Sequence, residues 1–388
     1  MSMMRNLLCI SFYCVIAAAS GALAADPVRI GVSLGESGKY QFPSRMQMRA
    51  YQLWENEVND RGGLLGRKVE MVILDDRGDK QQAIDNYRNL ISDDRVDLII
   101  GPYSSGITAA VAPVVENSGY PMLAAGAAAD AIWSHGYENV FGMWTPASRY
   151  SVFMLDIALL NDVQKIAIVH ADDPFSTIVA KGASKWVSRM EGLEEVYFKD
   201  FKKGRRDLKS LASEVEQAGA ELVIMGGHFN ESVDMSKAFK AIGWYPKAYF
   251  ATVGPALEKY GETLGNDAEC TFATSIWEPS VNFSKSQEFT KAFKESYQEV
   301  PSYHAATAYA AGQILEEASK LAGSLEHDEL RQALAKLDTF SVIGRYAVDR
   351  TGVQIKRFPL LIQWQNGKKE IVWPEDARTA KPRFNCGS

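Results

Sequence analysis

The sequence predicts an α/β protein with two doubly wound parallel sheets. Strands alternate with helices over residues 28–116, and the same rhythm returns over residues 164–254. Such alternation is typical of parallel sheets that are covered by helices. Ligands bind these sheets beyond the carboxyl ends of the strands. In the first half, those ends are the loops after Gly35, Asp76 and Gly101.

Each element of the first half follows from its hydrophobic pattern. Continuous apolar runs predict buried strands, whereas apolar residues at helical spacing predict amphipathic helices. Strands are therefore predicted at 29–35, 68–76 and 96–101, and helices at 47–60, 80–94 and 104–119.

The same patterns predict the elements of the second half. Strands are predicted at 164–170, 194–201, 221–227 and 248–254, with helices at 175–192, 208–219 and 233–244. An extended stretch at 269–280, helices at 286–299, 304–323 and 328–337, and strands within 345–352 and 356–373 follow. Asn366-Gly367 lies between two apolar runs and predicts a tight β-hairpin.

The N-terminal segment predicts export. Arg5 precedes a short apolar run rich in small residues, and Ala22-Leu23-Ala24 fits a cleavage site. Residues 1–24 are therefore expected to be a signal peptide, with Ala25 or Asp26 beginning the mature chain. A membrane anchor is the alternative, but the run is short of the ~20 residues that a span needs.

The bulk composition limits the partners. The remaining chain is long enough for two lobes. The full chain has a formal charge of −6, from 42 basic and 48 acidic residues, and removal of Arg5 makes the mature part more acidic, which argues against a nucleic-acid or anionic-membrane partner. Cys270 and Cys386 either form one disulfide in an oxidising compartment or stay as separate thiols.

Four segments in a fixed order carry a family resemblance: GGLLGRKVEMVILDDRGDKQQA, IIGPYSSGITAAVAPVVENSGYPMLAAGAA, KIAIVHADDPFS and PSYHAATAYAAGQIL. With them the chain resembles periplasmic solute-binding proteins of ABC importers, in the leucine/isoleucine/valine-binding branch. The resemblance implies a type I periplasmic-binding fold, in which two α/β lobes are joined by a three-strand hinge. It also implies a monomeric periplasmic receptor that needs no cofactor or metal. Such a receptor delivers an amino acid or related small carboxylate to an ABC permease in the inner membrane; a ligand sensor for signalling is the alternative.

The same resemblance divides the chain into lobes. Lobe one is expected at 26–145 plus 276–339, lobe two at 147–275 plus 343–374, and a C-terminal tail at 375–388. The three crossovers are expected near 144–147, 275–278 and 341–345.

The loop after the third strand is the first candidate ligand site. Tyr103, Ser104 and Ser105 lie where the third helix begins. A serine here caps backbone amides, and amides that stay free form an anion site. Ser105 matches the serine that binds the ligand carboxylate in the resembled family, although a cap alone is the simpler reading.

Further candidates come from four other loops. Ala125, Gly126 and Ala127 match a loop that offers backbone groups and often a hydroxyl, which Ala127 lacks; a plain turn is the alternative. Phe175 and His228 match aromatic ligand contacts of lobe two. Trp144 and Tyr303 are further candidates for the wall, although buried aromatic residues more often belong to the core.

Val253 is the main departure from the resembled family. Its amino-acid receptors carry a carboxylate near this point, which pairs with the ligand ammonium. A buried ammonium without a partner is costly. Either Asp172, Asp173 or Glu231 replaces that carboxylate, or the ligand lacks an amine, as an aromatic or aliphatic carboxylate, an amide or a keto acid does.

Enzyme motifs are missing from the sequence. It contains no G-x-S-x-G elbow, Walker loop or C-x-x-C pair, and its five histidines are not at metal-ligand spacing. The acidic cluster at 75–79 could hold a divalent metal, but Asp79 suits the cap of the following helix, and the resembled family commonly carries acidic residues here without metal. We expect neither catalysis nor a cofactor.

Overall fold

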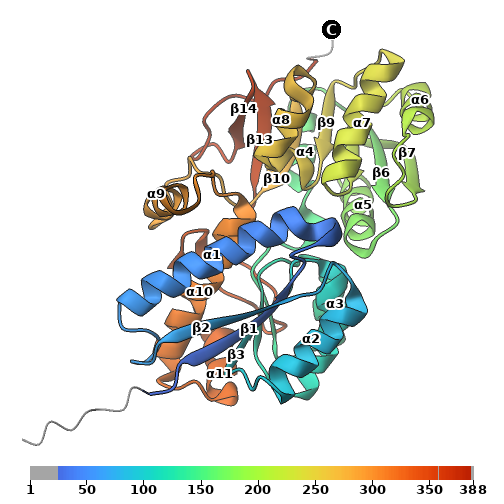
Figure 1. Ribbon diagram of the computed structural model, residues 1–388. Helices are drawn as coiled ribbons and strands as arrows, with labels where there is room; N and C mark the ends of the chain where they lie inside the picture. Colours follow the sequence, from blue (N-terminus) through green and yellow to red (C-terminus); the bar gives the residue numbers. More distant parts are fainter. Residues whose placement is uncertain (1–24, 357, 386–388) are drawn as a thin grey trace, which may run out of the picture.

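A computed structural model describes residues 25–356 and 358–385, which form two lobes stacked end to end (Figure 1). The predicted signal peptide and Cys386 lie outside the described residues. Cys270 is disulfide-bonded. No helix in the described part of the chain is long and apolar enough to cross a membrane.

Lobe one contains a five-stranded sheet of order β2-β1-β3-β4-β5. All four neighbouring pairs are parallel. The strands are β1 (Val28–Leu34), β2 (Val69–Asp75), β3 (Leu98–Ile100), β4 (Met122–Ala124) and β5 (Val140–Gly142).

Helices cover both faces of this sheet. α1 (Gln41–Asp60) and α10 (Tyr303–Ala322) pack on one face, while α2 (Lys80–Ser92) and α3 (Ser105–Asn117) pack on the other. α10 reaches the lobe from far along the sequence and lies beside α1 (Figure 1). The pair approaches closely because Gly312 has no side chain, and a Cβ there would lie 2.1 Å from the Trp54 ring. α9 (Ser286–Tyr297) and α11 (His327–Lys336) complete the lobe.

Lobe two contains a seven-stranded sheet of order β14-β13-β10-β9-β8-β6-β7. The strands are β6 (Lys165–Ala171), β7 (Glu194–Phe201), β8 (Leu222–Gly226), β9 (Ala248–Ala251), β10 (Thr271–Ser275), β13 (Leu360–Gln365) and β14 (Lys368–Trp373). β6 to β10 run parallel, and β13 and β14 add an antiparallel edge. The predicted hairpin is confirmed, since Asn366 and Gly367 adopt φ of 54° and 72° between β13 and β14.

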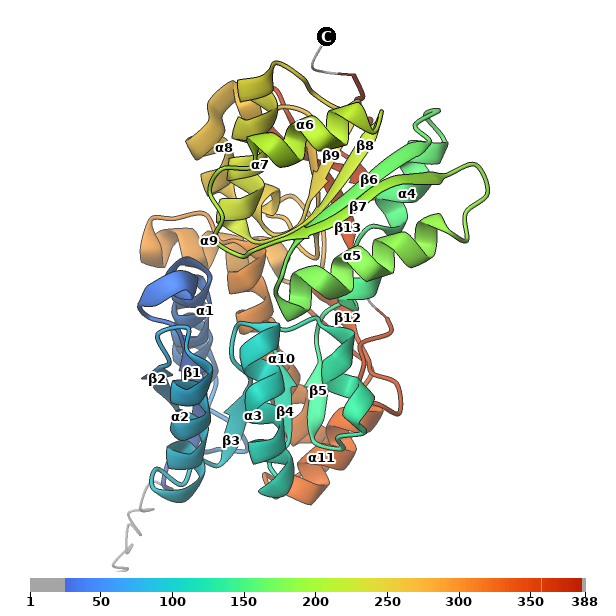
Figure 2. The same ribbon diagram turned by 90° about the vertical axis from the view of Figure 1, so that its right-hand side faces the viewer.

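Helices also cover both faces of the second sheet (Figure 2). α4 (Val152–Leu159) and α5 (Pro174–Val187) pack on one face, against alternate residues of β6. α6 (Lys209–Gln217) and α7 (Phe229–Ile242) pack on the other face. α8 (Glu258–Leu264) lies beside α7. The predicted α/β class with two parallel-sheet lobes is therefore confirmed.

Several boundaries differ from the sequence prediction. α1 begins at Gln41, six residues before the predicted start at 47, because Pro43 is tolerated in the first turn of a helix. β4, β5 and α4 lie in the stretch between 120 and 164 for which no element was predicted, and α8 was also missed.

The third crossover is the least regular. β11 (Thr339–Ser341) and β12 (Gly344–Tyr346) form a separate two-stranded sheet. Gly142 of β5 donates a backbone hydrogen bond of 2.7 Å to the carbonyl of Gly352, so this part of the chain still lies against lobe one. We propose that the chain passes from lobe one to lobe two between Gly352 and Leu360 rather than at residue 343.

A buried ion pair holds the second crossover to lobe two. Lys369 Nζ of β14 lies 2.8 Å from Glu278 Oε2, and the two side chains are only 6% and 4% exposed. Lys369 also donates to the carbonyl of Ala256. Glu258 Oε1 also lies 3.2 Å from Lys369 Nζ, but its side chain is half exposed. Removal of Lys369 therefore leaves an uncompensated charge mainly on the buried Glu278.

We predict that Lys369→Met lowers the free energy of unfolding by about 3–5 kcal/mol, because Glu278 is left buried without a cation. Urea denaturation measures this. The double variant Lys369→Met/Glu278→Gln is expected to recover much of the loss, and Lys368→Met at the exposed neighbour is the matched control. Equal stability of Lys369→Met and the control would contradict the assignment.

Candidate ligand-binding cleft

The amino-terminal ends of four helices lie at the cleft between the lobes. α3 and α10 begin there from lobe one, and α5 and α7 begin there from lobe two. The first residues of these helices therefore meet in space although they are far apart in sequence. Each helix N-terminus carries a partial positive charge and unpaired backbone N–H groups.

A small cavity of about 40 Å³ lies at this meeting point. Both lobes contribute to its wall, which is made by Tyr103, Ser104, Ser105, Gly126, Ala128, Trp144, Tyr150, Phe175, His228, Val253, Thr274, Tyr303 and His304. None of these side chains is a carboxylate.

Most of the predicted site residues meet at this wall, but two do not. Ala127 is fully buried in the core of lobe one, and Ala128 takes its place at the cavity. Ala125 lies behind the wall, where its carbonyl accepts a hydrogen bond of 2.7 Å from Trp144 Nε1. Gly126 does line the cavity; a Cβ there would lie 2.5 Å from the backbone of Tyr103.

The first turn of α3 offers hydrogen-bond donors to the cavity. Ser105 Oγ accepts the backbone N–H groups of Ala128 and Ala129 at 3.1 and 3.2 Å, which leaves its own O–H to donate. The backbone N–H groups of Ser105 and Gly106 have no acceptor within the described residues. Ser104 holds the N-cap position, but its hydroxyl contacts Tyr40 rather than capping the helix. This end of the cavity suits an anion.

Aromatic rings form the rest of the wall. Tyr103 packs edge-on against His304 with ring centroids 5.0 Å apart, and Trp144 packs against Tyr303 at 5.3 Å. In lobe two, Phe175 lies 5.6 Å from His228. Tyr40 of lobe one continues the layer across the cleft.

Tyr40 contacts rings of both lobes, with centroids 5.2 Å from Tyr103 and 5.9 Å from His228. Aromatic side chains therefore make up most of the wall, which is apolar, and its polar groups lie at the helix ends.

Val253 lines the cavity in a strained backbone conformation. Its φ is 57° and its ψ is −63°, and Gly254 N donates to Thr252 O at 2.6 Å, which closes a γ-turn. This region is unfavourable for a β-branched residue and costs on the order of 1–3 kcal/mol. The surrounding structure holds the valine where an acidic residue was expected from the family resemblance.

The three acidic residues considered as replacements all lie outside the wall. Asp173 caps α5 and lies 3.4 Å from Lys203 Nζ and 3.5 Å from His228 Nε2. Burial alone would raise its pKa, but His228, Lys203 and Ser176 outweigh it and hold the pKa of Asp173 well below the usual range.

The other two acids are also engaged. Asp172 is exposed and accepts the backbone N–H of Lys203. Glu231 accepts the backbone N–H groups of His228 and Gly204. All three acids are therefore held by other partners and lie outside the cavity wall in this arrangement of the lobes.

A wider mouth of about 440 Å³ adjoins the cavity and shares Tyr103, His228, Val253 and His304 with it. Its ionic side chains are three lysines and one glutamate, namely Lys39, Lys203, Lys259 and Glu231. Two of these lysines, which belong to lobe two, contact residues of lobe one. Lys203 Nζ lies 3.4 Å from the Tyr40 hydroxyl, and Lys259 Nζ lies 5.6 Å from the Phe42 ring centroid.

Sequence reasoning missed Tyr150, Thr274 and His304. Thr274 Oγ1 donates to the carbonyl of Tyr150 at 2.6 Å and fixes that loop. His304 is 2% exposed, and burial, followed by the charge of His228, lowers its pKa to about 3. Its Nδ1 has no hydrogen-bond partner among the described residues. Only its place in the first turn of a helix could have marked it.

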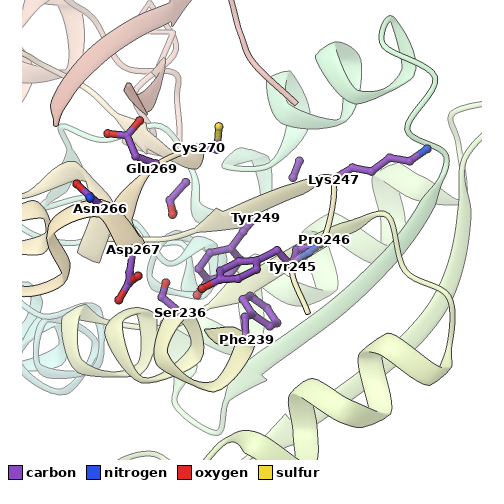
Figure 3. Close-up of a pocket in the computed structure, with 12 residues that line it drawn as sticks. Ser236, Phe239, Tyr245, Pro246, Lys247, Tyr249, Asn266, Asp267, Glu269 and Cys270 are labelled. Atoms are coloured by element: carbon purple, nitrogen blue, oxygen red, sulfur yellow. The ribbon is translucent and has the colours of Figure 1, made fainter. Parts of the chain in front are cut away.

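A separate cavity of about 330 Å³ lies in lobe two beside Cys270 (Figure 3). Tyr245, Tyr249 and Asp267 line it, and it shares no residue with the inter-lobe cavity. The described residues contain no group of acidic, histidine or cysteine side chains that could hold a metal ion. In the acidic cluster at 75–79, Asp75 and Asp76 accept backbone N–H groups of their own turn.

Comparison with known proteins agrees with this geometry. Leu/Ile/Val-binding protein homolog 7 of Brucella suis biovar 1 (strain 1330) is 28% identical over 98% of this chain and 100% of its own length. The substrate-binding protein LivJ of Streptococcus pneumoniae, in complex with isoleucine, superposes with a TM-score of 0.80 at 23% identity, covering 90% of this chain and 100% of LivJ. A solute-binding protein of an R. palustris ABC transporter, in complex with benzoate, gives 0.80 at 19% identity, covering 92% and 99%.

A family model described as periplasmic binding protein matches residues 27–369, which is most of the chain. The predicted family and the expectation of no catalysis are thereby confirmed, since the members of this family bind solutes and are not enzymes. The chain belongs to the periplasmic binding protein family.

Proposed function

We propose that this protein is the extracytoplasmic receptor of an ABC importer and that it binds a small carboxylate without an ammonium group. One observation carries the choice of ligand: the N-termini of α3 and α10, which have no side-chain cap, meet at a cavity whose wall contains no carboxylate, whereas Asp173 and Glu231 already occupy the N-termini of α5 and α7. Positive helix ends favour an anion and disfavour a cation.

The charges at the mouth support an anionic ligand. Three lysines face one glutamate there, and clefts lined by one sign of charge raise the local concentration of ions of the opposite sign. The aromatic wall supports an apolar body, and the similar R. palustris protein holds benzoate.

Binding in two steps follows from the positions of the donors. Lobe one offers the N–H groups of Ser105 and Gly106 and the hydroxyl of Ser105, and so holds the carboxylate first. Lobe two then adds Phe175, His228 and Val253 over the apolar body. Hinge closure of this kind is general among periplasmic binding proteins. Delivery to an inner-membrane permease, a periplasmic location and a monomeric state complete the proposal.

An amino acid is the second candidate, because the Brucella relatives are named as homologs of a Leu/Ile/Val-binding protein. It requires Asp173 or Glu231 to leave its present partners and turn toward the cavity. A thermal-shift panel separates the candidates, with protein unfolded and refolded to remove bound solute. The panel pairs leucine with 4-methylpentanoate and phenylalanine with 3-phenylpropanoate, and adds benzoate.

A ligand at a hundredfold excess over its Kd stabilises the protein by about 2.7 kcal/mol, which the panel detects. Shifts with the amine-free acids alone support the proposal. Shifts with leucine or phenylalanine alone overturn it in favour of the second candidate.

We predict that Ser105→Ala weakens binding of the tightest acid by about 1–3 kcal/mol, because a buried hydrogen bond to the ligand is lost. Isothermal titration calorimetry measures the change. Ser104→Ala is the matched control and is expected to weaken binding less. The Ser104 hydroxyl lies 3.4 Å from the Tyr40 hydroxyl and does not hold the loop that contains Ala128 and Ala129. An unchanged affinity in a folded Ser105→Ala protein would remove this hydroxyl from the site.

We predict that Val253→Asp moves specificity toward amino acids. The new carboxylate faces the cavity, and aspartate tolerates positive φ better than valine. Leucine is expected to gain about tenfold or more in affinity through a charged hydrogen bond, and amine-free acids are expected to bind more weakly. Val253→Asn relieves the same backbone strain without the charge. Equal binding profiles of the two variants would contradict the prediction.

A further inference from the structure

His304 is a buried polar residue of the wall whose chemistry the carboxylate proposal does not use. It is the second residue of α10 and lines both the cavity and its mouth. Its ring lies between Tyr103 and Tyr303, at centroid distances of 5.0 and 4.0 Å. Tyr103 leads directly into the first turn of α3. The Tyr103 ring therefore lies between His304 and the end of the cavity where the carboxylate is proposed to bind.

The imidazole is buried and lacks a partner in the described part of the chain. The residue is 2% exposed and Nδ1 has no hydrogen bond. The hydrophobic surroundings lower its pKa to about 3, so the ring is neutral at pH 7 and offers one N–H donor and one nitrogen acceptor. Buried polar groups in folded proteins are normally paired, so an unpaired imidazole in a binding wall is a candidate contact for a ligand.

We propose that His304 selects a carboxylate whose apolar body also carries a hydroxyl group, and this inference rests on the proposed function. A hydroxyl both donates and accepts, so it pairs with either tautomer of a neutral imidazole. An ammonium is a poorer partner, because the helix N-termini at this cavity disfavour a second positive charge. A purely hydrocarbon body leaves the imidazole unpaired once closure expels water.

Another buried histidine, His170, offers a matched comparison. His170 is also buried, at 5% exposed, but its Nδ1 lies 2.8 Å from the carbonyl of Ala171. It is not part of the cavity wall. His170→Phe therefore replaces a buried histidine without touching the proposed ligand contact.

The experiment compares matched acids on the full mature protein by isothermal titration calorimetry. Benzoate is compared with its three hydroxy isomers, and 3-phenylpropanoate with its ring-hydroxylated forms. The wild-type protein is expected to bind at least one hydroxylated acid about tenfold or more tightly than its parent acid. His304→Phe is expected to bring that ratio close to one. His304→Gln, which keeps a donor and an acceptor, and His170→Phe are expected to retain it.

Because each ratio is taken within one variant, a general loss of folding cancels. A wild-type ratio near one for every pair, with the parent acids still binding, overturns the role of His304 and leaves the proposed function standing. A ratio that survives in His304→Phe also overturns it. Failure of all the acids to bind, with leucine binding instead, overturns the proposed function and the inference together.

Discussion

The direction of the strands determines what this molecule can bind. Both sheets are parallel, except at the β13–β14 edge, and in both lobes the helices that follow the strands begin at the inter-lobe cleft. The N-terminal ends of α3, α5 and α7 therefore face one small volume, and α10, which follows α9 rather than a strand, begins there as well. No single loop provides this; it results from placing two doubly wound lobes with their carboxyl ends opposed. Everything else at the cleft modifies a site that already favours negative charge.

Burial then increases the energetic effect of each polar group at the cleft. A wall of aromatic rings excludes water, so hydrogen bonds to Ser105 and its neighbours gain strength, and groups left unpaired cost more. The acids nearest the cavity are held by Lys203, His228 and backbone N–H groups. Val253 keeps an apolar side chain in a backbone conformation that favours other residues. These three features act in the same direction, toward a ligand with one negative end and an uncharged body.

The sequence was sufficient for the α/β class, for most strands of the two sheets and for most residues of the loops that meet at the cleft. Long strands such as β1 and β6 are continuous apolar runs, and Asn366-Gly367 suits positive φ at both positions. β4 and β5 were missed because three residues give no period, and α4 because it is apolar on nearly every side. His304 was missed because its ring neighbours come from residues 103, 144 and 303, and only the whole fold brings the first two to it. The one local sign of a site at His304 is Ser302, which holds the N-cap position of α10 as Ser104 holds that of α3.

The lysines that cross the mouth act on a different equilibrium. Lys203 contacts Tyr40 and Lys259 contacts Phe42, so both contacts join one lobe to the other. Such contacts stabilise this arrangement of the lobes without forming part of the binding wall. A solute that meets a larger fraction of protein in the binding-competent arrangement loses less of its intrinsic affinity to the conformational change. Side chains outside the binding wall can thereby set how tightly a solute is held without changing which solute is preferred.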